Sequence, residues 1–250
     1  MVKIQDCIRL AMPKRSILIF FCPGNKWGYF LNFRYELSFT LFIVKPRSLK
    51  FLLFISILAF AGCYVSKDPM RKEVKGLQKG TIKDDSSYVY ALPYEEGNVH
   101  RLMQGYFGKF SHKERVALDF NMKRGTNVCA AREGVVVRVK EDGDRGGWGK
   151  KYRKYGNNIV IQHADGTRAG YWHLQKDGAL VDVGDTVKKG QVIGLSGKTG
   201  YAFQPHLHFI VWISQGGDWQ QIPTRFETSK GIKYLRALKR YRRPKHSDYF

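Results

Sequence analysis

Residues 125–137 read GTNVCAAREGVVV, and residues 184–194 read GDTVKKGQVIG. Each stretch begins at a glycine turn, passes through a short strand pattern to a second turn, and ends in another strand pattern. Two such units, rolled into one sheet, make a barrel-sandwich shape. The shared rhythm therefore predicts a barrel-sandwich hybrid that is built as a duplicated half-barrel.

The segments around these two units have the same texture. Short runs of alternating or β-branched residues are separated by clusters of Gly, Asp and Asn, which is typical of antiparallel sheets with tight turns. We therefore expect an all-β, mainly antiparallel domain. Its strands should lie near residues 116–122, 134–140, 158–163, 169–174, 191–196 and 206–214. A single helix pattern, strongly basic, is expected at residues 231–241.

The composition excludes two classes of protein. The 250 residues include 43 Lys and Arg against 21 Asp and Glu, a net charge of +22, yet 43% of them are hydrophobic. That apolar content excludes a disordered polyelectrolyte. No uninterrupted apolar run reaches the ~20 residues of a spanning helix, which excludes a polytopic membrane protein. The charge indicates either an anionic partner, such as nucleic acid, lipid or cell-wall polymer, or a solvated surface.

Residues 45–63, KPRSLKFLLFISILAFAGC, have the pattern of an export signal. Basic residues precede an apolar run at 51–61, which is too short to span a membrane. The ending AGC resembles a bacterial lipoprotein signal in which Cys63 is lipidated, although Phe60 stands where Leu is usual. A simple signal peptide, an uncleaved anchor or a buried strand are the alternatives. We expect an exported, membrane-anchored lipoprotein of the cell envelope that faces the periplasm.

An export signal should begin near the N-terminus, yet 44 residues precede this one. One explanation is that the assigned start lies too far upstream and that translation begins at Val44; the alternative is a genuine cytosolic extension. The chain is then divided into an uncertain extension at 1–44, a signal peptide at 45–62, an anchor and polar tether at 63–87, a β domain at 88–228 and a basic tail at 229–250.

Residues 205–209, PHLHF, carry the strongest local signal for chemistry. Alternate side chains of a strand share a face, so His206 and His208 lie together, opposite an apolar face that includes Leu207 and Phe209. Two imidazoles at this spacing can converge on one metal ion or flank it. Two solvated histidines would be the alternative.

A second strand pattern, at residues 116–122, places Asp119 on its polar face, and His112 precedes it on a turn. A third pattern is Tyr171-Trp172-His173-Leu174. There we expect Trp172 and Leu174 to point inward, and Tyr171 and His173 to point outward to a polar side. All three strands then present functional atoms on the face opposite the core, which favours a metal site.

These three patterns, in this order, resemble the lysostaphin/LytM-type zinc endopeptidases over residues 90–226. The connecting segments agree with the resemblance, among them residues 158–166 and 183–197. It implies an antiparallel β domain with a groove that holds one zinc ion, and hydrolysis of peptide bonds in peptidoglycan. Members with lost ligands act as non-catalytic regulators of another wall hydrolase, but here all five positions are filled.

The resemblance assigns roles residue by residue. It implies zinc ligands at His112, Asp119 and His208, and it makes His173 and His206 the catalytic pair. Three protein ligands leave a fourth position open, as catalytic zinc requires. Six residues separate His112 from Asp119 where the commoner family spacing is three, and a looped-out turn would accommodate the extra ones.

Other candidates are given structural roles. We expect His163 to be structural, His246 to be solvated and Cys129 to be a small buried residue. Residues 141–156 are rich in Gly, basic residues and aromatics, and they could form one wall of the groove that contacts wall peptides; the alternative is a mobile surface loop. The partners implied are peptidoglycan and a membrane, and nucleic acid is not expected.

Overall fold

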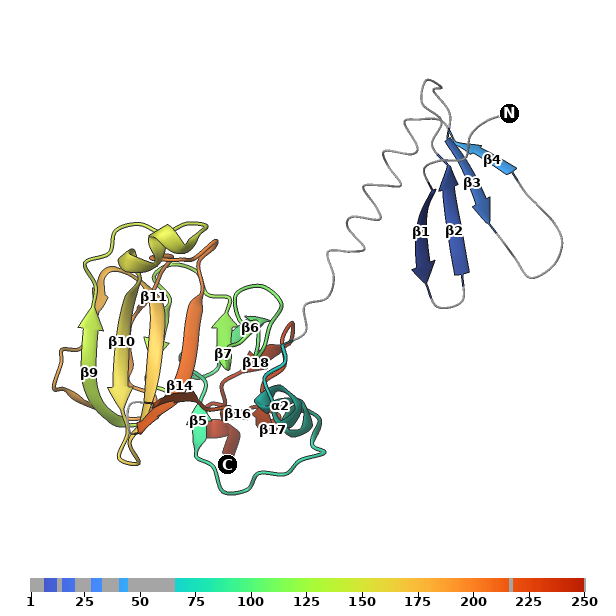
Figure 1. Ribbon diagram of the computed structural model, residues 1–250. Coiled ribbons are helices and arrows are strands. Elements are labelled where there is room, and N and C mark those ends of the chain that lie inside the picture. The colour runs from blue at the N-terminus through green and yellow to red at the C-terminus, as the bar shows by residue number, and fades with distance from the viewer. Residues whose placement is uncertain are drawn as a thin grey trace, which may run out of the picture. The chain divides into compact units, whose positions relative to one another are not determined.

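A computed structural model describes residues 7–12, 15–20, 28–32, 41–44, 66–215 and 218–249 (Figure 1). The chain divides into two compact units, Met1–Cys63 and Tyr64–Phe250. In the first unit, four strands pair in sequence as an antiparallel sheet: β1 Cys7–Met12, β2 Arg15–Phe20, β3 Gly28–Asn32 and β4 Leu41–Val44. The expected signal at residues 45–62 and the expected lipidation site at Cys63 lie outside the described residues.

The second unit contains most of the described strands, β5 to β18. Its elements are α2 Met70–Lys79, β5 Val89–Ala91, β6 Val99–Gln104, β7 Ala117–Phe120, β8 Asn127–Cys129, β9 Gly134–Lys140, η1 Lys150–Tyr155, β10 Asn157–Gln162, β11 Thr167–Ala179, β12 Thr186–Val187, β13 Val192–Ser196, β14 Leu207–Gln215, β15 Asp218–Gln221, β16 Arg225–Thr228, β17 Gly231–Tyr234, β18 Arg240–Arg242 and η2 His246–Tyr249. Among the described residues, no helix is long and apolar enough to cross a bilayer.

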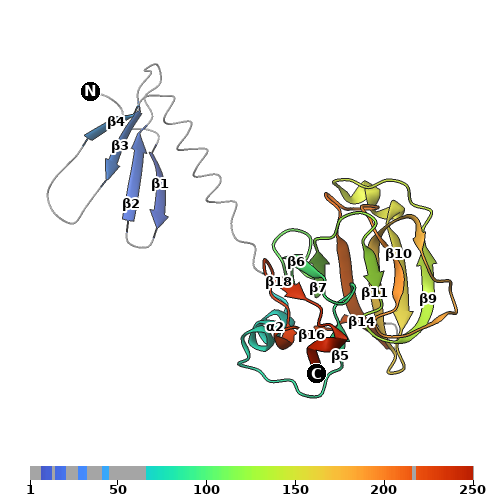
Figure 2. The same ribbon diagram turned by 180° about the vertical axis from the view of Figure 1, so that it is seen from behind.

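One large antiparallel sheet organises this unit. Its strands follow the order β12-β9-β10-β11-β14-β7-β6-β18, and Figures 1 and 2 show β9, β10, β11 and β14 side by side from both directions. Beyond this path, β13 pairs with β11 and β8, and β15 pairs with β14. The prediction of a mainly antiparallel all-β domain is confirmed.

The two similar stretches, residues 125–137 and 184–194, pair with each other and close the sheet on itself. The first supplies β8 and β9, the second supplies β12 and β13, and they pair crosswise: β8 with β13, and β9 with β12. Strand β11 belongs to both parts of the sheet. It pairs with β14 up to Trp172 and with β13 from Leu174 onward. The pairing is that of the barrel-sandwich hybrid expected from the sequence.

The two faces of the large sheet are different. On one face, alternate residues of β7, β11 and β14 enter the main core, among them Leu118, Phe120, Leu207 and Phe209. The opposite face carries a second, smaller apolar cluster made by Ala117, Val160, Ile210 and Trp212, with Trp172 packed against it. The polar residues of the predicted site share this second face.

The prediction of a helix at residues 231–241 is wrong. The chain there forms β17, which pairs antiparallel with β16, and then β18, which pairs with β6. Leu235 between them is fully buried. Pairing with strands that are distant in sequence overrides a weak local pattern. Residues 229–250 were expected as a basic tail, and the described part of this segment contributes two strands to the folded unit.

Helix α2 lies in a segment for which no regular element was expected. Val74 and Gly76 are buried, and the side-chain amide of Gln78 donates to the carbonyl of Leu235 at 2.6 Å. Gly80 ends the helix in the left-handed region, with φ of 76°. Met70, Val74 and Leu77 follow the i, i+4, i+7 spacing of a helix, a short period that the sequence analysis missed among the charged residues. The helix is stabilised by its contacts with the domain.

A hydrogen bond inside the main core supplies a test of this fold. The fully buried hydroxyl of Tyr171 accepts from the backbone N–H of Ala131 at 2.8 Å. Tyr171→Phe should lower the free energy of unfolding by about 1–3 kcal/mol, because it leaves a buried N–H without a partner. Denaturant unfolding measures the change. Tyr88→Phe, which removes a hydroxyl bonded to the exposed Glu133, should change it by less than about 1 kcal/mol. Equal effects of the two substitutions would contradict the role given to Tyr171.

Candidate metal centre

Three side chains converge on the polar face of the sheet. Nε2 of His112 lies 3.1 Å from Oδ1 of Asp119, and Nδ1 of His208 lies 2.8 Å from the same oxygen. The two imidazole nitrogens are 3.1 Å apart. These three atoms form a group that could hold a metal ion. Edges of about 3.3 Å are what a tetrahedral zinc with bonds of about 2.0 Å requires, so the donor set fits zinc.

Strand pairing places two of these residues, and a turn places the third. Asp119 on β7 stands directly opposite His208 on β14, and the neighbouring pairs Leu118–Phe209 and Phe120–Leu207 point to the core. His112 lies in the connection between β6 and β7, fully buried. Its Nδ1 lies 3.2 Å from the carbonyl oxygen of Gly105, and this contact turns Nε2 towards Asp119.

The charge of the cluster is concentrated on Asp119. Burial raises the pKa of this carboxyl, but His112 and His208 outweigh burial and hold the pKa well below its ordinary value. Burial lowers the pKa of His208 to about 4, against the opposing effect of Asp119. The group therefore offers an ionised carboxylate and a neutral imidazole at pH 7, which are the protonation states that metal ligation needs.

His206 and His173 lie beside this group. Their ring centroids are 4.6 Å apart, and Nε2 of His206 is 3.8 Å from Oδ1 of Asp119. Nδ1 of His206 donates to the carbonyl of Gln204 at 2.8 Å, and Nδ1 of His173 donates to that of Thr199 at 2.7 Å. The neutral form of each ring would therefore carry its proton on Nδ1 and leave Nε2 as an acceptor. The structure brings all five predicted site residues together.

A β-bulge places His173. Asn157 pairs with Leu174 and Asn158 with Trp172, so His173 is an extra residue in β11. Its φ is 69°, in the left-handed region that non-glycine residues rarely adopt. Burial lowers the pKa of His173 well below its ordinary value, and the nearby His206 adds to this effect.

The bulge corrects the expected alternation of residues 171–174. Tyr171, expected to point outward, is fully buried in the main core. Trp172, expected inward, lies on the site face, where its ring centroid is 6.1 Å from that of His208. The expectations for His173 and Leu174 agree with the structure. Strict alternation fails because one extra residue shifts the period at His173.

Two contributors were missed by the sequence analysis. Gln104 donates from Nε2 to Oδ2 of Asp119 at 2.9 Å, and it is buried. Thr199 supplies the carbonyl that orients His173, and its hydroxyl donates to the carbonyl of Leu174 at 2.6 Å. Neither residue belongs to a pattern of metal ligands, and the sequence contains no signal that singles them out.

Residues 141–156 lie beside the segment that leads to His206. Gly146 and Gly200 form a backbone bridge between the two segments. Trp148 is 68% exposed, and its ring meets the rings of Tyr201 and Phe203 edge to face. The basic η1 follows directly. An exposed aromatic cluster with cations therefore stands next to the candidate metal centre.

The remaining candidates lie elsewhere in the second unit. His163 is buried, and its Nδ1 donates to the carbonyl of Glu133 at 2.7 Å, as expected of a structural histidine. Cys129 is buried, and burial raises the pKa of its thiol to about 11, so it is no nucleophile.

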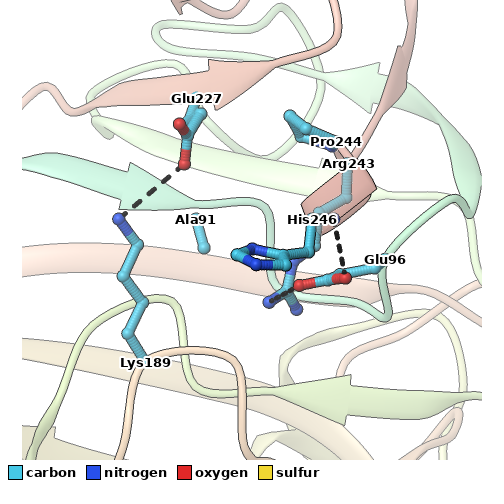
Figure 3. A pocket seen from close by; sticks show the side chains of 7 residues that line it. All are labelled: Ala91, Glu96, Lys189, Glu227, Arg243, Pro244 and His246. Atoms are coloured by element: carbon cyan, nitrogen blue, oxygen red, sulfur yellow. Dashed lines mark hydrogen bonds and ion pairs between the residues drawn. The ribbon is translucent and has the colours of Figure 1, made fainter. Parts of the chain in front are cut away.

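A separate hollow of about 190 Å³ is shown in Figure 3. Its charges balance in two long ion pairs, Lys189 with Glu227 at 3.9 Å and Arg243 with Glu96 at 3.8 Å. The five predicted site residues are not among those that line it.

Comparisons with known proteins match the part of the chain that contains most of this site. The model of peptidase family M23 matches residues 113–221, a range that begins one residue after His112 and contains the other four site residues. Lysostaphin of Staphylococcus staphylolyticus is 45% identical over 93 residues, which are 37% of this chain and 17% of lysostaphin. The peptidoglycan DD-endopeptidase ShyA of Vibrio cholerae is 41% identical over 91 residues, 36% of this chain and 18% of ShyA.

The match with one solved structure extends over most of that structure's chain. The catalytic domain of lysostaphin from Staphylococcus simulans is 33% identical, covers 50% of this chain and 87% of its own, and has a TM-score of 0.36. Residues 113–221 of this chain form a peptidase M23 domain. The chain spans about a fifth of the length of the curated relatives that it matches.

The first prediction for the site concerns metal content. We expect the purified chain to bind one zinc ion, and Asp119→Ala to weaken binding by more than about 100-fold, because it removes the anionic donor. Competition with a chromophoric chelator measures the affinity. Asp142→Ala removes an exposed carboxylate that pairs with Lys140 and should leave the affinity unchanged. Full zinc affinity in Asp119→Ala would show that the ligand set is wrong.

Proposed function

We propose that this protein is a zinc-dependent endopeptidase that hydrolyses peptide bonds in the cross-links or stem peptides of bacterial peptidoglycan. The observation that carries the proposal is the convergence of His112, Asp119 and His208 next to His173 and His206. The peptidase M23 domain supports it, as does the similarity to a peptidoglycan DD-endopeptidase and to lysostaphin.

His112, Asp119 and His208 are the proposed zinc ligands. A zinc ion held by them would polarise the scissile carbonyl and make a bound water more acidic. The protein holds each donor ready before the metal arrives: the carbonyl of Gly105 orients His112, and Gln104 occupies the second oxygen of Asp119. Three ligands leave room for water and substrate.

His173 and His206 are the proposed catalytic residues. With Nδ1–H bonded to a backbone carbonyl, the neutral form of each ring would present the lone pair of Nε2 to the site. One ring can take the proton of the attacking water, and a ring that carries a proton on Nε2 can donate to the oxyanion of the tetrahedral intermediate. The fixed Nδ1 bonds hold both rings in the orientation that this exchange of protons needs.

The aromatic cluster of Trp148, Tyr201 and Phe203, with the basic η1, is the proposed wall of the substrate groove. Exposed aromatic rings contact the apolar parts of a peptide, and the cations in residues 150–154 meet its carboxylates. The wall adjoins His206, so a bound peptide would lie along the candidate metal centre.

We further propose that the protein works outside the cytoplasm, anchored to a membrane through a lipid on Cys63 or through an uncleaved signal. Peptidoglycan is found there, and residues 45–63 have the pattern of an export signal. Metabolic labelling with a fatty acid tests the lipid: Cys63→Ser should abolish labelling, and Cys129→Ser should not.

Hydrolysis of purified peptidoglycan tests the activity. We expect soluble fragments to be released by the full chain and not in the presence of a chelator, and mass analysis of the fragments identifies the bond. His173→Ala should lower the rate by about 100–1,000-fold while zinc stays bound, because it removes a proton-transfer or oxyanion group. Intact peptidoglycan with zinc-loaded protein would instead favour a non-catalytic regulator of another hydrolase.

Two neighbouring histidines should respond oppositely to added zinc. His208→Ala removes a ligand, so excess zinc should restore part of the activity. His206→Ala removes a group that acts on protons, so excess zinc should not help. Fragment release at neutral pH measures both, after thermal unfolding has shown that both variants are folded. Restoration of both variants by zinc would contradict the assignment of roles.

A further inference from the structure

Gln104 is the polar side chain that contacts the proposed zinc site most directly from outside it. Residue 104 is the last of β6, and 7% of its surface is exposed. Its Nε2 donates to Oδ2 of Asp119 at 2.9 Å and to the hydroxyl of Ser111 at 2.8 Å. Its Oε1 accepts from the backbone N–H groups of Phe110 at 3.0 Å and Ser111 at 3.1 Å. A single buried amide thus connects Asp119 with the loop that carries His112.

A bulge in β6 produces this contact. Leu102 pairs with Phe120 and Gln104 with Asp119, so two residues of β6 match one of β7. In the next pair of strands, Asp119 stands opposite His208. The three side chains form a row across β6, β7 and β14. Bulges re-aim side chains in this way, and without this one Gln104 would not face the carboxylate.

The two oxygens of Asp119 have separate partners because of this row. Oδ1 faces His112 and His208 at 3.1 and 2.8 Å, whereas Oδ2 accepts from Gln104. A carboxylate with one oxygen held in this way cannot rotate freely. Its other oxygen therefore stays directed at the point where the imidazoles converge.

Gln104 also holds the loop that makes the spacing between His112 and Asp119 longer than is usual. The loop between β6 and β7 is attached to Gln104 through Phe110 and Ser111, next to His112. Gly108 lets the amide pass, because a Cβ added there would collide with Cγ of Gln104. The loop and the carboxylate are thus held by one side chain.

We propose that Gln104 is a positioning residue that fixes Asp119 and the His112 loop in the geometry for binding zinc. The inference rests on the proposed zinc site. Loss of a partner that orients a metal ligand typically weakens metal binding by about 10–100-fold. We expect a loss of this size in Gln104→Met, which keeps the length of the side chain and removes its four hydrogen bonds.

Two further variants separate positioning of the carboxylate from support of the loop. Gln104→Glu can still accept from Phe110 and Ser111, and in its ionised form it places an oxygen instead of a donor against Oδ2 of Asp119. At a pH at which the new carboxyl is ionised, Gln104→Glu should bind zinc more weakly than the wild type. Gln78→Met is the matched control, because Gln78 lies on α2 and its side-chain amide donates to Leu235, away from the five site residues. It should keep the affinity of the wild type.

The experiment measures zinc affinity of the full chain by competition with a chromophoric chelator, together with the visible spectrum of the Co²⁺ form. The positioning role predicts a lower affinity and a changed cobalt spectrum in both Gln104 variants, with the wild-type result in Gln78→Met. Wild-type affinity in Gln104→Met or Gln104→Glu overturns the inference and leaves the proposed function intact. A wild type that binds no zinc overturns both.

Thermal unfolding of the metal-free proteins shows whether each variant folds. If Gln104→Met does not fold, Gln104→Asn provides the test, because it keeps a buried amide and shortens its reach to Oδ2 of Asp119 by one carbon. A lower zinc affinity in Gln104→Asn supports the positioning role, and wild-type affinity overturns it.

Discussion

The pairing of β7 with β14 at Asp119 and His208 is the contact on which the rest of the site depends. The register is enforced from the opposite face, where Leu118, Phe120, Leu207 and Phe209 are buried in the main core. A slip of one residue in the pairing would turn these apolar side chains to the polar face and Asp119 into the core. The fold would then lose the free energy of burial of several apolar side chains. The hydrophobic core thus determines where the carboxylate and the imidazole meet.

Regular pairing alone would not complete the site, and two bulges supply what it lacks. One extra residue in β11 directs His173 to the site face, with φ of 69°. One extra residue in β6 sets Gln104 opposite Asp119. The strained backbone at His173 persists only where its surroundings hold it, and the bond from His173 to the carbonyl of Thr199 contributes to that support. The four bonds of Gln104 hold its side chain in place beside Asp119.

Features that obey a regular period could be predicted from the sequence, and features that break one could not. The faces of β7 and β14 alternate strictly, so Asp119, His206 and His208 could be assigned to the polar face from their spacing. Alternation failed at Tyr171 and Trp172, because a bulge shifts the period without leaving a mark in the residue types. The helix expected at 231–241 failed because β16 and β6 offer strand partners that are distant in sequence. Gln104 could not be found, since a glutamine is as ordinary on a surface as in a site.

Burial and charge explain why the centre suits a divalent cation. Burial lowers the pKa of His173 and of His208, so these rings stay neutral at pH 7 and keep a lone pair for a metal or a proton. Asp119 stays ionised in the same buried place, since neighbouring imidazoles and the amide of Gln104 stabilise its charge. The carboxylate still leaves a negative charge in a buried place, and a cation at its Oδ1 would compensate that charge. The apolar packing around the cluster would therefore also favour the binding of a metal ion.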